Sequence, residues 1–254
     1  MRIKIEGITT NGKALFLAYD QGLEHGPSSD FNDKNVDPLY IIDIAKRGKV
    51  NALVFQKGIV EKYIVEIKKS RVPLILKLNG KTSLYKGEPI ARQLCSVSEA
   101  LHFGALAVGY TIYIGSEHEA EMLEEFEKIE KEAHKHGLPV VVWIYPRGAS
   151  VKEDVNREMI SYAARTGLEI GADIVKIKYG SNAADLKWAV KSAGRCKVVV
   201  AGGMKTTESD FLQHAKDIMQ AGAAGLAVGR NVWQAEKPIE LAKKLRKIIF
   251  STNK

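Results

Sequence analysis

Cysteine and long apolar runs are both scarce in this sequence. Only two cysteines, Cys95 and Cys196, occur among 254 residues, and they lie far apart, which argues against a disulfide-stabilised secreted scaffold. No apolar run approaches the roughly 20 residues that a membrane-spanning helix needs. Residues 1–6 lack the pattern of a signal peptide. We therefore expect a cytoplasmic protein that does not bind membranes.

Hydrophobic and charged residues are plentiful and evenly mixed. They make up 45% and 27% of the chain, a balance typical of folded globular proteins rather than disordered ones. The length allows a large core, and no Pro/Ser-rich linker or shift in composition divides the chain. We expect a single domain over residues 1–254.

The chain carries an excess of positive charge. It has 38 Lys and Arg against 30 Asp and Glu, a net charge of +8. Solvated lysines on helix faces, nucleic-acid binding and an anionic small substrate would each account for that excess. The basic residues are dispersed and no nucleic-acid-binding motif is present, so we expect no nucleic-acid partner. Composition does not choose between the other two explanations.

Short apolar runs alternate with longer amphipathic stretches along the whole chain. The runs do not alternate apolar and polar residues, as is typical of parallel strands buried on both faces. Between them, Glu119–Lys135 is the clearest helical pattern, and 209–220 and 238–249 repeat it. Eight strand–helix units in about 250 residues predict an α/β protein with a (β/α)₈ TIM barrel. A doubly wound sheet is the alternative, but no GxGxxG motif follows the first run. The eight expected strands are 14–19, 52–55, 74–78, 106–110, 140–145, 174–179, 198–201 and 226–228.

Active sites of such barrels lie at the carboxyl ends of the strands, so candidate catalytic residues are expected directly after the apolar runs. Asp20 follows the first run and is either an acid/base group or an Asx turn. Trp143 and Tyr145 are two residues apart on the fifth run, so both should point to the barrel mouth. Followed by Arg147, Tyr145 is a candidate for proton transfer or substrate orientation, and the alternative is a core aromatic residue.

The sixth run contains two lysines, Lys176 and Lys178, in an otherwise apolar strand. Lysine is seldom fully buried, and burial lowers its pKa, which makes the amine a nucleophile able to form a Schiff base. In the alternative, one lysine reaches solvent while the other pairs with a carboxylate. Lys77, on the third run, either lines the barrel or takes part in a structural ion pair.

Glycines follow the last two expected strands. Gly202 and Gly203 follow the seventh strand, and Gly229 and Arg230 follow the eighth, where barrels of this kind often bind phosphate. Tight turns are the alternative for each glycine pair. No metal-binding pattern is present, and we expect neither a metal nor a cofactor. The absence of a GxSxG nucleophile elbow argues against a serine hydrolase.

Taken together, these segments resemble the archaeal-type class I fructose-bisphosphate aldolases. The resemblance runs in order over nearly the whole chain and is carried by residues 20–27, 74–82, 143–148, 174–180 and 228–231. It implies a (β/α)₈ barrel without a metal, which reversibly cleaves fructose 1,6-bisphosphate to dihydroxyacetone phosphate and glyceraldehyde 3-phosphate. It also implies a homo-oligomeric ring, such as a decamer of two pentamers.

The resemblance assigns roles to individual residues. The Schiff-base lysine falls on Lys176 rather than Lys178, the catalytic tyrosine on Tyr145, which would take the proton of the C4 hydroxyl, and the catalytic aspartate on Asp20. One departure is Gln21, which stands where the family usually has histidine, although His25 is retained. The remaining substrate contacts would be Trp143, Arg147, Lys178 and Lys81, with Gly202, Gly203, Gly229 and Arg230 at the phosphate.

Three other functions compete with this interpretation. A sibling lysine-dependent aldolase or transaldolase, such as a 2-amino-3,7-dideoxy-D-threo-hept-6-ulosonate synthase, would share Asp20, Lys176 and the phosphate site. The Trp143–Tyr145 segment and the stretch 74–88 favour the glycolytic and gluconeogenic enzyme. A cofactor-free sugar-phosphate isomerase would instead use carboxylate or histidine bases, and the paired strand lysines argue against a non-catalytic binding protein.

Overall fold

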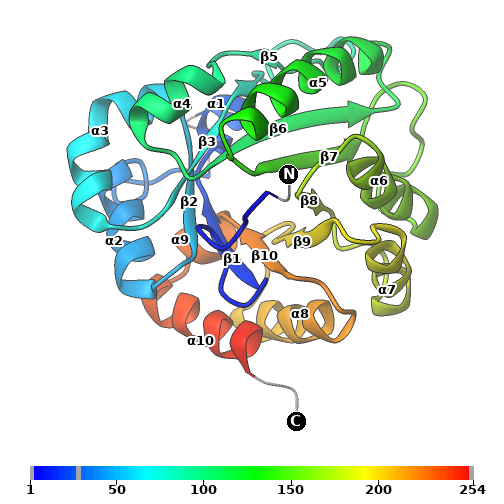
Figure 1. Cartoon of the computed structure of the whole chain (residues 1–254). Coiled ribbons are helices and arrows are strands. Elements are labelled where there is room, and N and C mark those ends of the chain that lie inside the picture. Colours follow the sequence, from blue (N-terminus) through cyan, green and yellow to red (C-terminus); the bar gives the residue numbers. More distant parts are fainter. Residues whose placement is uncertain (1–2, 27–29, 252–254) are drawn as a thin grey trace.

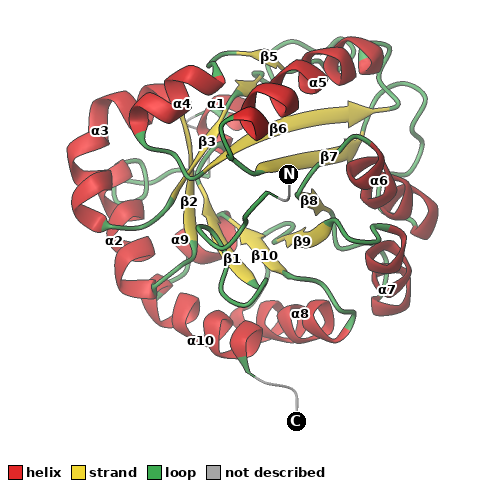
Figure 2. Cartoon of the chain, viewed as in Figure 1, coloured by secondary structure: helices red, strands yellow, loops and turns green. Residues whose placement is uncertain are grey.

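The expected barrel is present in the computed structural model, which describes residues 3–26 and 30–251 (Figures 1 and 2). Pro27, part of the segment 20–27, and Met1 and Arg2 lie outside the described residues. Eight parallel strands close in the order β1-β10-β9-β8-β7-β6-β3-β2. They are β1 Ala14–Ala18, β2 Ala52–Gln56, β3 Leu74–Lys77, β6 Ala107–Ile114, β7 Val140–Pro146, β8 Ile174–Ile177, β9 Lys197–Ala201 and β10 Gly225–Val228.

Helices surround the barrel and connect successive strands. They are α1 Gln21–His25, α2 Pro38–Gly48, α3 Lys57–Ser70, α4 Val97–Phe103, α5 Glu119–Lys135, α6 Arg157–Glu169, α7 Ala183–Ser192, α8 Glu208–Gln220, α9 Arg230–Trp233 and α10 Pro238–Phe250. None of those in the described residues is both long and apolar enough to cross a membrane. The predicted helix Glu119–Lys135 matches α5, and glycines with positive φ at Gly104, Gly171 and Gly222 precede β6, β8 and β10.

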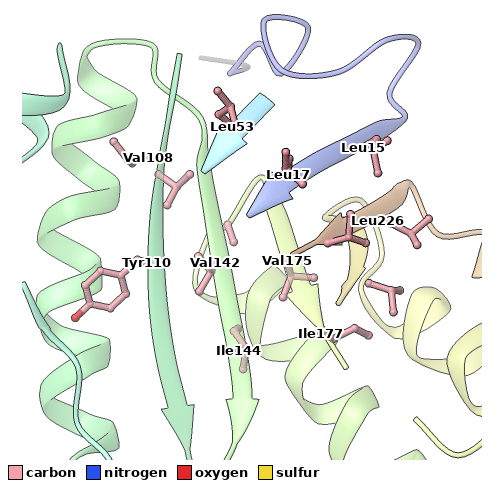
Figure 3. Close-up of a cluster of buried hydrophobic side chains, with 14 of the residues drawn as sticks. Leu15, Leu17, Leu53, Val108, Tyr110, Val142, Ile144, Val175, Ile177 and Leu226 are labelled. Carbon is pink, nitrogen blue, oxygen red and sulfur yellow. The ribbon is translucent and has the colours of Figure 1, made fainter. Parts of the chain in front are cut away.

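Two apolar cores hold the barrel together. The strand residues that face outward pack against the helices in one large cluster, of which Leu17, Val142 and Ile177 are examples (Figure 3). A smaller cluster, including Phe16, Val54 and Val141, fills the barrel interior. The alternation of side chains along each strand places every second residue inside the barrel. Lys176 has inward parity, and its ammonium lies beside the interior residue Trp143.

The structure differs from the expected strands mainly at their ends. The fourth expected run, 106–110, continues to Ile114, where β6 pairs with β7 up to Pro146. The sixth run ends at Ile177 rather than at residue 179. Its strand, β8, pairs with β7 only as far as Lys176 and with β9 only as far as Ile177. An unexpected two-stranded sheet, β4 Asn79–Gly80 and β5 Arg92–Gln93, follows β3.

Candidate active site

A cavity of about 620 Å³ opens at the carboxyl ends of the barrel strands. It brings together residues that lie up to 210 positions apart in the sequence, from the end of β1 to the start of α9. Lys81 instead lines a small crevice beside this cavity, next to Asp20 and Lys77. The predicted site residues that line the cavity are Asp20, Gln21, His25, Trp143, Tyr145, Arg147, Lys176, Lys178, Gly202, Gly203, Gly229 and Arg230.

Lys176 is a buried amine in this cavity. Its side chain comes from β8, and the residue is only 7% exposed. Burial, which removes water from the ammonium, lowers the pKa of Lys176 to about 8, and the nearby charge of Lys77 acts in the same direction, against the charge of Asp20. The neutral fraction at pH 7 is therefore about 300 times that of an exposed lysine. Lys176 can act as a nucleophile towards a carbonyl carbon.

Trp143 forms the wall beside this amine. It is the register partner of Lys176 on the neighbouring strand β7, and the Nζ atom lies 5.2 Å from the centre of its ring. Gly109 of β6 leaves the space for the indole, since a Cβ atom there would lie 2.6 Å from Trp143. The indole Nε1 is buried and has no hydrogen-bond partner in the described residues, so it is free to donate to a bound substrate.

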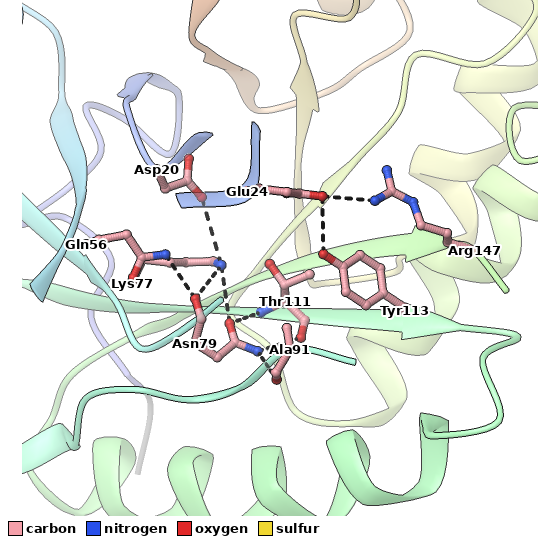
Figure 4. A network of polar contacts seen from close by, with 9 residues as sticks. All are labelled: Asp20, Glu24, Gln56, Lys77, Asn79, Ala91, Thr111, Tyr113 and Arg147. Carbon is pink, nitrogen blue, oxygen red and sulfur yellow. Dashed lines mark hydrogen bonds and ion pairs between the residues drawn. The ribbon is translucent and has the colours of Figure 1, made fainter. Parts of the chain in front are cut away.

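Asp20 pairs with a second buried lysine. Its Oδ2 lies 3.9 Å from Nζ of Lys77, which is 3% exposed and donates hydrogen bonds to the backbone and side-chain oxygens of Asn79 (Figure 4). Both alternatives for Lys77 therefore hold, because it lines the barrel and takes part in an ion pair. Burial lowers the pKa of Lys77, while Asp20 and Glu24 oppose that shift.

Tyr145 keeps its proton in this environment. It is half-buried at the end of β7, and burial together with the negative charges of Asp20 and Glu24 raises its pKa well above the ordinary value. The hydroxyl is therefore a hydrogen-bond and proton donor in the resting site. The expectation that Tyr145 itself takes a substrate proton stays a prediction, and it would require the tyrosinate form, which this environment disfavours.

Glu24 belongs to the site although it was not among the predicted site residues. It accepts a hydrogen bond from Nη1 of Arg147 at 2.9 Å and one from the hydroxyl of Tyr113 at 3.4 Å (Figure 4). Burial opposes its ionisation, but the Arg147 guanidinium holds the pKa of Glu24 below its usual range. Arg147 thus reaches the cavity as one half of an ion pair. These partners are 123 positions apart in the sequence, so no local pattern signals their contact.

Lys178 is also paired with a carboxylate. Its ammonium contacts Asp154, in the loop between β7 and α6, and lies at the cavity wall. Of the two lysines of the sixth run, Lys178 is therefore the one that pairs with a carboxylate. Lys176, by contrast, has no carboxylate oxygen within 4.0 Å among the described residues. The difference favours Lys176 as the nucleophile.

The loops after β9 and β10 form a cup suited to an anion. Asn231 of α9, another residue missed in the sequence, donates hydrogen bonds from Nδ2 to the carbonyl oxygens of Gly202, at 2.8 Å, and Met204, at 3.0 Å. Gly203 has φ +71°, a conformation that favours glycine. Arg230 lies at the start of α9 and contacts Asp30 at 3.2 Å. Backbone N–H groups and this guanidinium can bind a phosphate.

Gln21 closes the side of the cup nearest Asp20. A Cβ atom on Gly229 would lie 1.9 Å from Nε2 of Gln21. The carboxamide therefore comes so close to the backbone of residue 229 that only glycine fits there. Its Oε1 is buried and has no hydrogen-bond partner in the described residues. His25 lines the cavity but is exposed. The described part of the chain holds no group of three His, Cys, Asp or Glu side chains that could bind a metal.

Comparison with known proteins agrees with this geometry. The family described as DeoC/LacD aldolases matches residues 14–235, which include every barrel strand. The chain belongs to this aldolase family. The resemblance found in the sequence is confirmed by curated archaeal relatives as well. A class 1 fructose-bisphosphate aldolase from Thermoproteus tenax is 49% identical over 246 residues, which cover 96% of this chain and 92% of the relative.

Two further relatives bear on the chemistry of the family. A solved archaeal fructose-1,6-bisphosphate aldolase, with its catalytic lysine covalently bound to the carbinolamine intermediate of the substrate, is 48% identical with a TM-score of 0.91. The match covers 96% of this chain and 97% of that one. A 2-amino-3,7-dideoxy-D-threo-hept-6-ulosonate synthase from Archaeoglobus fulgidus is 32% identical over 98% of this chain and 90% of the relative.

Proposed function

We propose that this aldolase is a single-domain, class I fructose-bisphosphate aldolase, a lyase that works through a Schiff base without a metal or cofactor. It cleaves fructose 1,6-bisphosphate reversibly to dihydroxyacetone phosphate and glyceraldehyde 3-phosphate. The observation that carries the proposal is the buried Lys176 amine, whose pKa is lowered to about 8 and which lines the same cavity as the anion cup. The 49% identity to the Thermoproteus tenax aldolase supports the substrate.

The reaction begins at Lys176. Its neutral amine attacks C2 of the open-chain ketose and forms a carbinolamine, which loses water to give an iminium ion. Asp20, close to Lys77 and on the cavity wall, moves a proton from the nitrogen to the oxygen of the first adduct, and solvent supplies the further proton with which the hydroxyl leaves as water. The iminium accepts the electron pair released when the C3–C4 bond breaks, so the ketose fragment remains bound as an enamine.

Proton transfers complete the cleavage. The C4 hydroxyl loses its proton to the Asp20 carboxylate as the aldehyde forms, and Tyr145 hydrogen-bonds the same oxygen. Tyr145 then donates its proton to C3 of the enamine, a role that fits its raised pKa. Water hydrolyses the resulting iminium and releases dihydroxyacetone phosphate, and Tyr145 regains a proton from Asp20. The acid and the base thus exchange one proton in each cycle.

The two phosphates would anchor the substrate at opposite ends of the cavity. The C1 phosphate fits the cup of Gly202, Gly203, Gly229 and Arg230, and Gln21 lies between this cup and Asp20. Arg147, on the cavity wall, and Lys81, in the adjoining crevice, would bind the C6 phosphate, with Lys178 and His25 as further contacts on the cavity wall. Binding energy from the phosphates would position C2 next to Lys176.

A cytoplasmic homo-oligomer, such as a decameric ring, is part of the proposal. The two cysteines are free and buried, as suits a reducing compartment. Tyr162 of α6 and Trp188 of the adjacent α7 are 60% and 44% exposed, and aromatic residues of this size are enriched in protein interfaces. Light scattering after size exclusion gives the mass of the assembly, and a monomer would contradict this part.

A coupled assay of triose-phosphate formation tests the activity. We expect the purified protein to cleave fructose 1,6-bisphosphate, with the same rate in the presence of EDTA, and Lys176→Met to be inactive although folded. A folded wild-type protein that cleaves no sugar phosphate would contradict the proposal. Activity on a different ketose phosphate alone would favour the sibling synthase chemistry.

A further inference from the structure

The second buried lysine, Lys77, is held more tightly than the nucleophile. Its Nζ lies 3.2 Å from each of two oxygens of Asn79, the backbone carbonyl and Oδ1, and 3.9 Å from Oδ2 of Asp20. Lys176 donates no hydrogen bond to any of the described residues and forms no ion pair with them. The two buried amines therefore differ in partners although both are in the same site.

The side chain that holds Lys77 is itself fixed on all sides. Asn79 is fully buried, and its Nδ2 donates to the carbonyl oxygens of Ala91, at 2.9 Å, and Thr111, at 2.8 Å. Its Oδ1 also accepts the backbone N–H of Thr111 at 2.8 Å (Figure 4). Because both donors of the carboxamide are used, its oxygen must face Lys77. The site is thus built to accept hydrogen bonds from an ammonium at this position.

Lys77 and Lys176 share a wall and an anion. Their Nζ atoms lie 5.3 and 5.2 Å from the ring centre of Trp143, and the charges of Asp20 and Glu24 act on both amines, that of Asp20 more strongly. Asp20 comes within 4.0 Å of Lys77 only. A carboxylate paired with Lys176 would stabilise its ammonium, whereas a cation beside Lys176 disfavours it. Lys77 favours the neutral form of Lys176 in both ways, because it pairs with Asp20 and because it places a positive charge near the Lys176 amine.

We propose that Lys77 is a positioning residue that stays cationic, holds Asp20 away from Lys176 and thereby keeps the nucleophilic amine available in its neutral form. The inference rests on the proposed Schiff-base function. It assigns the Asn79 cradle to the same task, since Asn79 fixes where the Lys77 charge lies. Lys77 itself touches no reacting atom in this account.

The pH dependence of the reaction with substrate separates this role from a purely structural one. In Lys77→Met, removal of the charge and release of Asp20 both raise the pKa of Lys176. We expect the acid limb of kcat/KM to move up by about one pH unit, the size of effect that a nearby buried charge produces. Activity should fall about tenfold at pH 7 and return to within about twofold of the wild type at pH 9.5.

Two further variants keep the test decisive. Lys77→Gln retains a hydrogen-bond donor to Asn79 but no charge, and it should show the same displaced limb even where Lys77→Met folds poorly. Lys131→Met removes a surface lysine that pairs with Glu127 on α5, and its pH profile should match the wild type. Circular dichroism of each variant checks that it is folded.

The outcomes distinguish this inference from the proposed function. A wild-type protein that forms no covalent adduct with substrate overturns the Schiff-base function itself. A wild type that is active, together with folded Lys77 variants whose acid limb is unmoved, overturns only the role of Lys77. A uniform loss of activity at every pH would likewise contradict it, because that is the signature of a structural effect.

Discussion

Lys176 and Trp143 are register partners on adjacent strands, with the Lys176 ammonium 5.2 Å from the centre of the indole ring. The barrel thus places this amine, which forms no ion pair with any described residue, against the indole ring rather than against a carboxylate. Two consequences follow, one for the pH dependence of the reaction and one for the stability of the fold.

The rate should depend on a group with a pKa near 8. Lys176 must be neutral to attack, and its pKa is lowered to about 8 mainly by burial. We expect kcat/KM for the free enzyme to rise with pH through an apparent pKa of about 8 and then to level off. Steady-state assays between pH 6 and 10 measure this limb. A flat profile over pH 7–9 would contradict the assignment of the nucleophile.

Lys176 should make the folded protein less stable at neutral pH. Its pKa is lower in the folded state than the ordinary value of 10.5, so the unfolded chain binds more protons between about pH 8 and 10.5. The free energy of unfolding therefore rises with pH across this window, and below it the full cost, at most about 3 kcal/mol, remains. We expect Lys176→Met to unfold at higher urea concentration than the wild type at pH 7.

The difference in the free energy of unfolding between Lys176→Met and the wild type should shrink as the pH rises from 8 to 10.5. Over this range the wild-type lysine becomes neutral in the unfolded state as well as in the folded state. Urea titrations at pH 7 and 10 provide the comparison. Lys131→Met, on the surface of α5, is the matched control and should change stability by less than about 0.5 kcal/mol. A less stable Lys176→Met at pH 7 would show that the lysine stabilises the fold.

Gly109 should be needed for activity although it lies outside the set of reacting groups. A Cβ atom on this residue would lie 2.6 Å from the Trp143 ring and 3.2 Å from Cδ of Lys77. We expect Gly109→Ala to cost about 1–3 kcal/mol of stability and to lower kcat by displacing the indole. Trp143 fluorescence and activity would both report it. Gly58→Ala, where a Cβ atom meets nothing within 4 Å, serves as the control.

Arg147 should distinguish substrates with one and two phosphates. Its guanidinium lies in the cavity but is paired with Glu24 at 2.9 Å. In the proposed binding mode it contacts the C6 phosphate, so Arg147→Met should raise KM for fructose 1,6-bisphosphate about tenfold, as loss of a hydrogen bond to a charged group does. KM for fructose 1-phosphate should change little. Equal losses for both substrates would contradict this placement.

The barrel was predictable because its strands carry a signal that is local in sequence. Each strand is a short run buried on both faces, so the expected 140–145 and 174–179 runs overlap β7 and β8. Residues two apart on a strand point the same way, and Trp143 with Tyr145, like Lys176 with Lys178, line the cavity as expected. The exact ends of the strands could not be predicted from the runs, because they depend on where neighbouring strands stop pairing.

The polar partners of the site were not predictable in the same way. Glu24, Asn79 and Asn231 acquire their roles from contacts with residues 123, 32 and 29 positions away, and no periodicity records those contacts. The protonated state of Tyr145 also depends on the burial and the charges that folding creates around it. Sequence patterns can therefore select the reactive residue types but not the electrostatic state in which each one works.

Borohydride trapping tests the central claim most directly. The protein is incubated with dihydroxyacetone phosphate, reduced with borohydride and digested, and the modified peptide is identified by its mass. We predict one adduct, on Lys176, that is absent from Lys176→Met and retained in Lys178→Met. An adduct on Lys178 or Lys77, or none on a folded and active wild type, would contradict the account.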